Sequence, residues 1–211
     1  MKILKIVGIV FLLVVIAAGG YAFFVYRQVT DQNVKDLGVR YTTDDYDRAV
    51  KTKAHVDIPD PSALYLGSRF TAEGTQPIDQ TFTDAEISAI QNYSNEKRGP
   101  FRQVQIHFIG GNKVEASGYV VDPRVPKTGP VYVKGDVIQT GPKSFTTKID
   151  ELRVGSYVVP GAIVDQANGE FLGFVNGILS DISGLSVEKV DIQDGMVHFK
   201  GMIPKKLTGV E

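Results

Sequence analysis

The residue types best suited to chemistry in this sequence are its three histidines and its adjacent acidic pairs. A metal site needs several ligands that converge on one ion, and the sequence contains neither an HxH nor an HExxH spacing. The chain has no cysteine, which excludes thiolate ligands, cysteine nucleophiles and disulfides. We therefore predict that the protein binds no metal and uses no cofactor.

The acidic pairs have a simpler explanation than catalysis. Glycoside hydrolysis uses two carboxylates across one bond, but Asp44–Asp45 lies at a predicted helix start and Asp150–Glu151 at a predicted strand bulge. Ser156 lacks the strand–turn–helix setting of a nucleophile elbow, and the sequence contains no P-loop or dinucleotide fingerprint. We predict no catalytic residue, and we predict that the protein is not an enzyme.

Two of the histidines are predicted to lie on the polar face of a sheet. His198 falls opposite Asp191 in a hairpin that turns at Asp194–Gly195. His107 falls opposite Glu115 in an earlier hairpin. Cross-strand pairs of this kind contribute about 1 kcal/mol or less to stability. These histidines are therefore interpreted as surface residues rather than ligands.

Alternating apolar residues predict the strands that carry these side chains. A three-residue turn after residues 101–109 places Phe108 opposite Val114 and Ile106 opposite Ala116. Two more strands are expected around residues 131–137 and 145–149, with a bulge where the alternation slips at Asp150–Glu151. In the final hairpin, Ile192 pairs with Val197 and Val190 with Phe199.

Two short helices are predicted from their start signals. The stretch Tyr41–Tyr46 contains a threonine that can cap a helix, followed three residues later by an acid. A stronger signal follows, because Thr83 and Glu86 can form a reciprocal capping box while Phe82 packs on Ile87. Gly99 and the following proline end this second helix.

A longer helix is expected over about residues 162–183. Its apolar positions cover about half of the circumference, which exceeds the stripe of roughly 100° on a helix packed against one surface. Gly169, Gly173 and Gly177 lie together on the opposite side and predict close approach of another backbone. The apolar arc has two interpretations, a core wrapped by a curved sheet or the lining of a groove for an apolar ligand. The candidate ligand-binding residues are Phe171, Leu172, Phe174, Val175, Ile178 and Leu179.

The amino-terminal segment is predicted to be a membrane anchor. Residues 6–26 contain no charged residue, and at about 1.5 Å per residue this run can cross a hydrocarbon layer of ~30 Å. Lys2 and Lys5 favour a cytoplasmic amino terminus. The alternative is a cleaved signal peptide with a small-x-small site at Gly20-Tyr21-Ala22.

Length and charge set the remaining limits. The chain has 211 residues and a formal net charge of −1, so no basic surplus predicts nucleic-acid binding. We divide it into a cytoplasmic tip (1–5), a transmembrane anchor (6–26), a juxtamembrane segment with a short helix (27–80) and an α+β extracytoplasmic domain (81–211).

Three stretches carry a family resemblance. LRVGSYVVP and VEKVDIQDGMVHFKG, on either side of the long helix, resemble the carboxyl-terminal half of YpmS-like bacterial envelope proteins. FTDAEISAIQNY resembles the opening helix of tubular lipid-binding (TULIP-like) domains. The resemblance implies a long helix cradled by a curved sheet and an apolar groove able to hold acyl chains. It implies no catalytic residue.

We expect an α+β fold in which a curved antiparallel sheet wraps around one long amphipathic helix, with a shorter capped helix and a transmembrane helix before it. The predicted function is that of a non-catalytic, membrane-anchored protein that holds a lipid or other apolar ligand between the long helix and the sheet. The alternative is a structural or interaction module of the cell envelope with a closed core. The expected partners are the bilayer, a lipid and an envelope protein.

Overall fold

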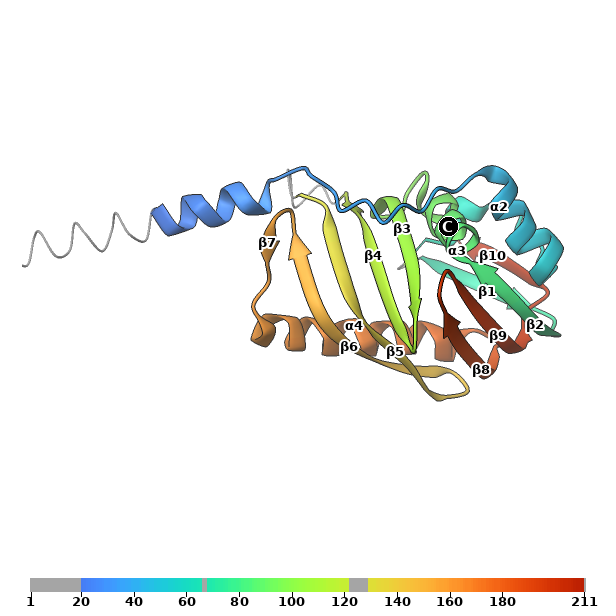
Figure 1. Cartoon of the computed structure of the whole chain (residues 1–211). Helices are drawn as coiled ribbons and strands as arrows, with labels where there is room; N and C mark the ends of the chain where they lie inside the picture. The colour runs from blue at the N-terminus through green and yellow to red at the C-terminus, as the bar shows by residue number, and fades with distance from the viewer. Residues whose placement is uncertain (1–19, 66–67, 122–128, 211) are drawn as a thin grey trace, which may run out of the picture.

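The structure is a computed structural model that describes residues 20–65, 68–121 and 129–210. Within the helix of residues 161–181, the side chains of Ala167, Phe171 and Phe174 lie outside the described part. The described chain forms an elongated body of antiparallel sheets, and a helical segment of residues 20–29 projects from one end (Figure 1).

The largest sheet has five strands in the order β3-β4-β5-β6-β7. Each strand pairs with the next one along the chain. Tight turns at Gly111–Asn112 and Pro142–Lys143 set the register of the β3–β4 and β5–β6 pairs. Its strands are β3 (Phe101–Gly110), β4 (Lys113–Val120), β5 (Val131–Gly141), β6 (Ser144–Val154) and β7 (Tyr157–Val158).

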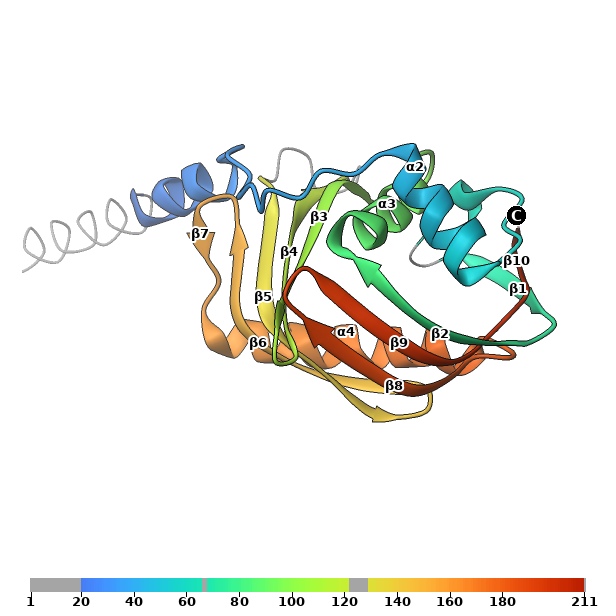
Figure 2. The same ribbon diagram turned by 45° about the vertical axis from the view of Figure 1, so that its right-hand side comes forward.

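Two smaller sheets are built from strands that are distant in sequence. One has the order β2-β9-β8 and the other pairs β1 with β10. The strands are β1 (Arg69–Glu73), β2 (Gln76–Thr83), β8 (Ser186–Gln193), β9 (Met196–Ile203) and β10 (Lys206–Val210). The chain therefore returns at its carboxyl terminus to pair with the segment that precedes the large sheet (Figure 2).

The helices cover the small sheets and the edges of the large one. Their bounds are α2 (Thr43–Asp47), the π-helix η1 (Arg48–Ala54), the 3-10 helix η2 (Pro61–Ala63), α3 (Asp84–Asn95) and α4 (Gly161–Asp181). Tyr46, Val50 and Ala89 form one buried cluster, and Ala49, Ile78 and Phe82 form another. The core thus lies between α2, η1, α3 and one face of the β2-β9-β8 sheet.

Polar side chains of α3 occupy the free edge of β3. The amide of Asn92 donates to the Val104 carbonyl at 2.7 Å and accepts from the Val104 N–H at 2.9 Å. The hydroxyl of Ser88 accepts from the Ile106 N–H at 2.9 Å. These side chains, one helical turn apart, hydrogen-bond residues that alternate along β3. The helix therefore takes the place of a neighbouring strand, which protects an edge that would otherwise expose unpaired backbone groups.

The opposite edge of the large sheet is protected in the same way by α4. The amide of Asn176 donates to the Phe145 carbonyl and accepts from its N–H, both at 2.9 Å. The amide of Asn168 donates to the Thr147 carbonyl at 3.1 Å and accepts from the Thr147 hydroxyl. Thus α4 is held along β6 by two asparagines.

Most of the local predictions are confirmed. Capping boxes form between Thr42 and Asp45 and between Thr83 and Glu86. Phe108 pairs with Val114 and Ile106 with Ala116 as predicted, and the final hairpin has the predicted pairs Ile192–Val197 and Val190–Phe199. The predicted bulge is confirmed too, since the β5–β6 register shifts between Glu151 and Ile149.

The predicted fold class is wrong. No long amphipathic helix organises the described chain, and no single curved sheet wraps around one. The strands form three antiparallel sheets, and α4 packs on β6 rather than on the final hairpin. The packing of α4 differs from the prediction because polar side chains make its contact with β6. Asn168 and Asn176 hydrogen-bond to β6, whereas the apolar Ile163 is 58% exposed.

Gly169, Gly173 and Gly177, the glycine ridge of α4, do not make the predicted close contact with another backbone. A Cβ added at Gly169, Gly173 or Gly177 would have open space around it, with no described atom within 4 Å. The three glycines therefore face away from the sheet in the described structure.

The predicted membrane anchor is not supported either. Among the described residues, no helix is long and apolar enough to cross a membrane, and this finding overturns the prediction of a single-pass membrane protein with a cytoplasmic amino terminus and an extracytoplasmic domain. The predicted tip (1–5) and residues 6–19 of the predicted span lie outside the described residues.

Candidate functional site

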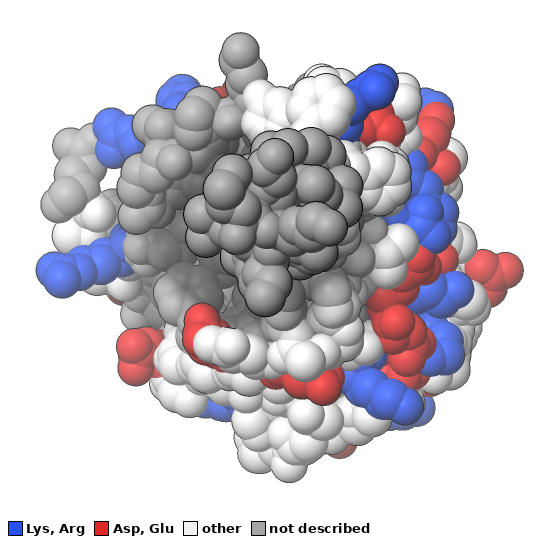
Figure 3. Space-filling model, turned by 90° about the vertical axis from the view of Figure 1, so that its left-hand side faces the viewer, with Lys and Arg blue, Asp and Glu red and all other residues white. Residues whose placement is uncertain are grey.

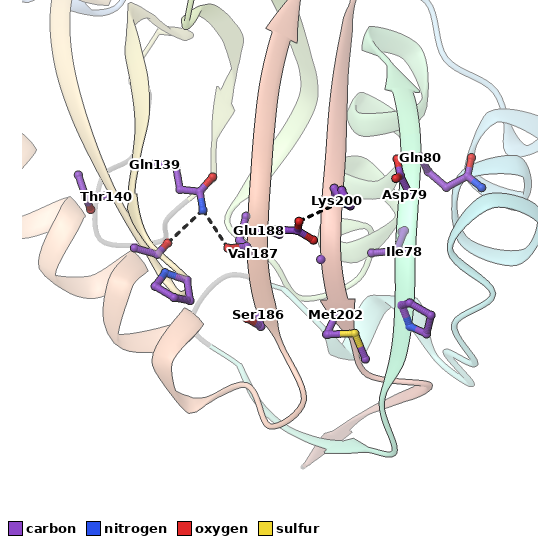
Figure 4. Close-up of a pocket in the computed structure, with 14 residues that line it drawn as sticks. Ile78, Asp79, Gln80, Gln139, Thr140, Ser186, Val187, Glu188, Lys200 and Met202 are labelled. Atoms are coloured by element: carbon purple, nitrogen blue, oxygen red, sulfur yellow. Dashed lines mark hydrogen bonds and ion pairs between the residues drawn. The ribbon is translucent and has the colours of Figure 1, made fainter.

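A groove of about 1110 Å³ crosses the outer face of the β2-β9-β8 sheet. The inner face of this sheet packs Ile78, Val197 and Phe199 against the core. Side chains alternate between the faces of a strand, so residues next to these point outward. The groove is lined by residues 77–80 of β2, 186–188 of β8 and 200–202 of β9, and the tip of the β5–β6 hairpin forms its side wall (Figure 4).

A bulge shapes the floor of the groove. Val187 pairs with Gly201 and Val190 with Phe199, and the register shifts at the intervening residue Glu188. The extra residue lets Val187 and Val190 face the same side although they are three positions apart. It also leaves Glu188 on the groove side, where it reaches Lys200. A Cβ at Gly201 would lie 2.1 Å from the Ser186 carbonyl oxygen, so the strands approach too closely there for any other residue.

Charged side chains form a line across the three strands. Lys200 donates to Glu188 at 2.8 Å on one side (Figure 4) and its Cα partner on the other strand is Asp79. Asp79 in turn contacts the Nε2 of His198 at 2.7 Å. The hydrogen bond from Lys200 to Glu188, together with the charges of Glu188 and Asp79, raises the pKa of Lys200 above its usual value. This lysine stays protonated at neutral pH, between the two carboxylates.

The side wall is fixed to the floor by an amide. Gln139 donates to the Val187 carbonyl at 2.9 Å (Figure 4). It also accepts a hydrogen bond from the Val190 N–H at 3.1 Å. The Pro142 carbonyl accepts a third hydrogen bond, from the Val187 N–H, at 2.7 Å. These bonds hold the β5–β6 hairpin against the edge of β8, so the side wall of the groove is in place before anything binds.

The two carboxylates of the line face solvent more than the lysine does. The side chains of Asp79 and Glu188 are 61% and 63% exposed, whereas that of Lys200 is 43% exposed. Counting Asp79, Glu188 and Lys200 as ionised gives a net charge of −1 for this line. On the end of the molecule shown in Figure 3, which lies away from the groove, acidic and basic side chains are interspersed.

The predicted ligand-binding residues lie elsewhere, on α4. Leu172, Val175, Ile178 and Leu179 are half-buried, and none of them lines the groove. The side chains of the two predicted phenylalanines, Phe171 and Phe174, lie outside the described part. A ligand between α4 and the sheet therefore stays a prediction.

The predicted histidine pairs are confirmed as backbone neighbours but not as side-chain partners. His107 lies opposite Glu115 and His198 opposite Asp191. The ring of His107 instead contacts Asp84 of α3 at 2.6 Å, and that of His198 contacts Asp79. Each imidazole reaches a carboxylate on the strand or helix beside its own hairpin. In the described part of the chain, no group of three or more histidine or acidic residues is placed to hold a metal ion.

Sequence reasoning did not find the groove because its residues come from four strands. Gln139, Asp79 and Lys200 are far apart in sequence, and each reads as an ordinary polar residue on a strand. The one usable signal was the local irregularity around Val187–Val190, where apolar residues fall three positions apart within a strand that otherwise alternates.

Comparison of the chain with protein-family models, with curated proteins and with solved structures gave no match. The resemblance to YpmS-like envelope proteins therefore stays a prediction. The descriptions of the protein as transmembrane, lipid-binding and TULIP-like are not supported by the comparisons or by the described helices.

Proposed function

We propose that the protein is a non-catalytic interaction module whose groove binds a basic, extended segment of a partner polypeptide. The observation that carries this proposal is the line Glu188–Lys200–Asp79, which crosses the floor of a preformed groove and leaves two carboxylates more exposed than the lysine between them. A cationic side chain of the partner would meet a carboxylate on either side of Lys200.

The dimensions of the groove support an extended segment. Neighbouring strands lie about 4.8 Å apart, so three strands span roughly 10 Å, which about three residues of extended chain can cross. Apolar side chains of the groove, Pro77, Pro142 and Met202, can contact the aliphatic parts of lysine or arginine. Complementary charge of this kind selects the partner and speeds association more than it raises affinity.

The fixed side wall also supports the proposal. Gln139 hydrogen-bonds the β5–β6 hairpin to Val187 and Val190. The hairpin therefore does not have to become ordered when the partner segment binds. Preorganised sites bind more tightly than flexible ones with the same contacts, because less conformational entropy is lost.

Isothermal titration of the full chain with the peptide Ala-Lys-Ala-Lys-Ala tests the proposal. We expect saturable binding that weakens as salt is raised, and about tenfold weaker binding to a variant that carries both Asp79→Asn and Glu188→Gln. The matched control carries Asp165→Asn and Asp181→Asn on α4, which removes the same charge away from the groove. Equal losses in the two variants, or equal binding of Ala-Glu-Ala-Glu-Ala, would show that the groove does not select a basic segment.

A further inference from the structure

The imidazole of His198 lies beside the charged line of the groove, on the outer face of the same sheet. It precedes Lys200 by two positions on β9, so both side chains point to the same side. Its Nε2 lies 2.7 Å from Oδ1 of Asp79. The side chain of His198 is 27% exposed, whereas that of Asp79 is 61% exposed. A partner can therefore still reach this carboxylate while the ring is held against it.

The contact between the ring and the carboxylate persists in both charge states of the ring. An ionised carboxylate only accepts hydrogen bonds, so the Nε2 of His198 carries a hydrogen and donates it to Asp79. The proton that charges the ring then adds to the other nitrogen, Nδ1. Protonation therefore changes the charge beside Asp79 without breaking the hydrogen bond.

The three strands of the groove floor carry few charged side chains, so a single proton changes their balance. Apart from the histidine, β2, β8 and β9 hold three acidic and two basic residues, namely Asp79, Glu188, Asp191, Lys189 and Lys200. With a neutral ring these charges sum to −1, and with a protonated ring they sum to 0. Proton uptake by His198 thus removes the net negative charge that attracts a basic partner.

The other charged groups of this face are paired with one another. Asp191 is the Cα partner of His198 on β8, and its carboxylate lies 3.8 Å from the Nζ of Lys189. Lys200 donates to Glu188 at 2.8 Å. The positive charge of Lys200 opposes protonation of the ring, while the negative charges of Asp79 and Asp191 favour it.

The elements that pack against β2 and β9 from elsewhere also have their charges paired. From η1, Lys53 contacts the buried carboxylate of Glu86 in α3 at 2.7 Å. From β3, the ring of His107 contacts Asp84 of α3 at 2.6 Å. Asp79 therefore stays the acidic group in direct contact with His198.

We propose that His198 makes the groove a pH-dependent site, in which proton uptake by the ring offsets the charge of Asp79 and weakens the binding of a basic segment. This inference rests on the function proposed for the groove. Histidine is the side chain whose charge ordinarily changes between pH 5 and 8, whereas the lysines of a partner stay charged there. Because coupling between two binding events is reciprocal, a partner lysine that binds beside Asp79 must in turn favour loss of the proton from the ring.

Isothermal titration of the full chain with Ala-Lys-Ala-Lys-Ala, acetylated and amidated at its ends, tests the inference at pH 5.5 and pH 7.5 and constant ionic strength. Acetylation removes the α-amino group, which would itself titrate near pH 8. We expect binding about threefold tighter at pH 7.5, since exposed ion pairs make modest contributions. Between these two pH values, titrations in buffers of different ionisation enthalpy should show release of protons on binding.

The variant His198→Gln identifies the group responsible. Glutamine keeps an N–H donor for Asp79 but gains no charge in this pH range. We expect its binding to be independent of pH and close to that of the unmodified protein at pH 7.5. His107→Gln is the matched control, because it removes a histidine that also contacts a carboxylate but lies outside the groove. It should keep the threefold dependence.

The outcomes separate this inference from the function on which it rests. The absence of saturable binding at either pH would overturn both. Saturable binding that is equally tight at the two pH values would overturn only the role of His198. The same conclusion would follow if His198→Gln kept the pH dependence, or if His107→Gln abolished it.

Discussion

The side chain of Asn92 hydrogen-bonds both backbone groups of Val104, as a neighbouring strand would. The same arrangement joins Asn176 of α4 to Phe145 and Gln139 of β5 to the backbone of β8. Side-chain amides have one donor and one acceptor side, so each can replace a peptide group of a missing strand. In this fold, carboxamides join elements that main-chain pairing does not join.

Replacing Asn92 by Ala should therefore destabilise the protein more than a surface substitution does. The N–H and carbonyl of buried Val104 would both lose their partner, at a cost of about 2–3 kcal/mol. Chemical denaturation measures this loss. Asn33→Ala, at an exposed position, is the control and should cost less than about 0.5 kcal/mol. A similar loss for both variants would mean that α3 does not depend on this amide.

The buried carboxylate of Glu86 gives a second prediction. It is fully buried, with Lys53 at 2.7 Å and the N–H of Thr83 at 2.9 Å. Lys53→Ala leaves this charge without its nearest cation, and we expect a loss of about 3 kcal/mol in the free energy of unfolding. Lys51→Ala removes an exposed i,i+4 pair with Asp47 and should cost about 0.5 kcal/mol or less. Equal effects would refute the role given to Lys53.

The pH dependence of stability should report on Glu115. Burial alone would raise the pKa of Glu115, but hydrogen bonds from Tyr132 and Lys134 and the charge of Lys35 outweigh it and hold the pKa below its usual value. A lowered pKa stabilises the folded state above the unfolded value of about 4.3, and that stability is lost as the pH falls through the folded value. Glu115→Gln should therefore be less stable at pH 7 and should lose less stability on acidification. Parallel curves for the two proteins would contradict this account.

The open glycine ridge of α4 predicts a stabilising substitution. Because a Cβ at Gly173 would meet no described atom within 4 Å, Gly173→Ala should raise the free energy of unfolding by about 0.5–1 kcal/mol through its helix propensity. In contrast, Gly201→Ala should destabilise the protein, because its Cβ would lie 2.1 Å from a carbonyl oxygen. Thermal unfolding of both variants checks the two signs. Destabilisation by Gly173→Ala would show that α4 has a contact on that side.

Local structure was predictable where neighbouring residues determine it. The caps at Thr42 and Thr83, the hairpin registers and the bulge at Asp150 depend on residues within a few positions of one another. The separation into three sheets was not predictable in this way, because β2 pairs with β9 and β1 with β10 across most of the chain.

The error over α4 has a specific physical cause. Its broad apolar arc predicted a helix surrounded by sheet, but two asparagines, Asn168 and Asn176, decide where the helix lies. Polar residues within an apolar helix are easily read as its solvent side. Here they are its point of attachment, because the β6 edge offers backbone groups that need partners.

The proposed binding groove is tested most directly by mapping the amide chemical shifts of the full chain during titration with Ala-Lys-Ala-Lys-Ala. We predict saturable shifts on all three strands of the floor, at Asp79, Glu188 and Lys200, and at Gln139 in the side wall. Shifts confined to other surfaces, or the absence of saturation, would contradict the assignment of the groove as the site of interaction.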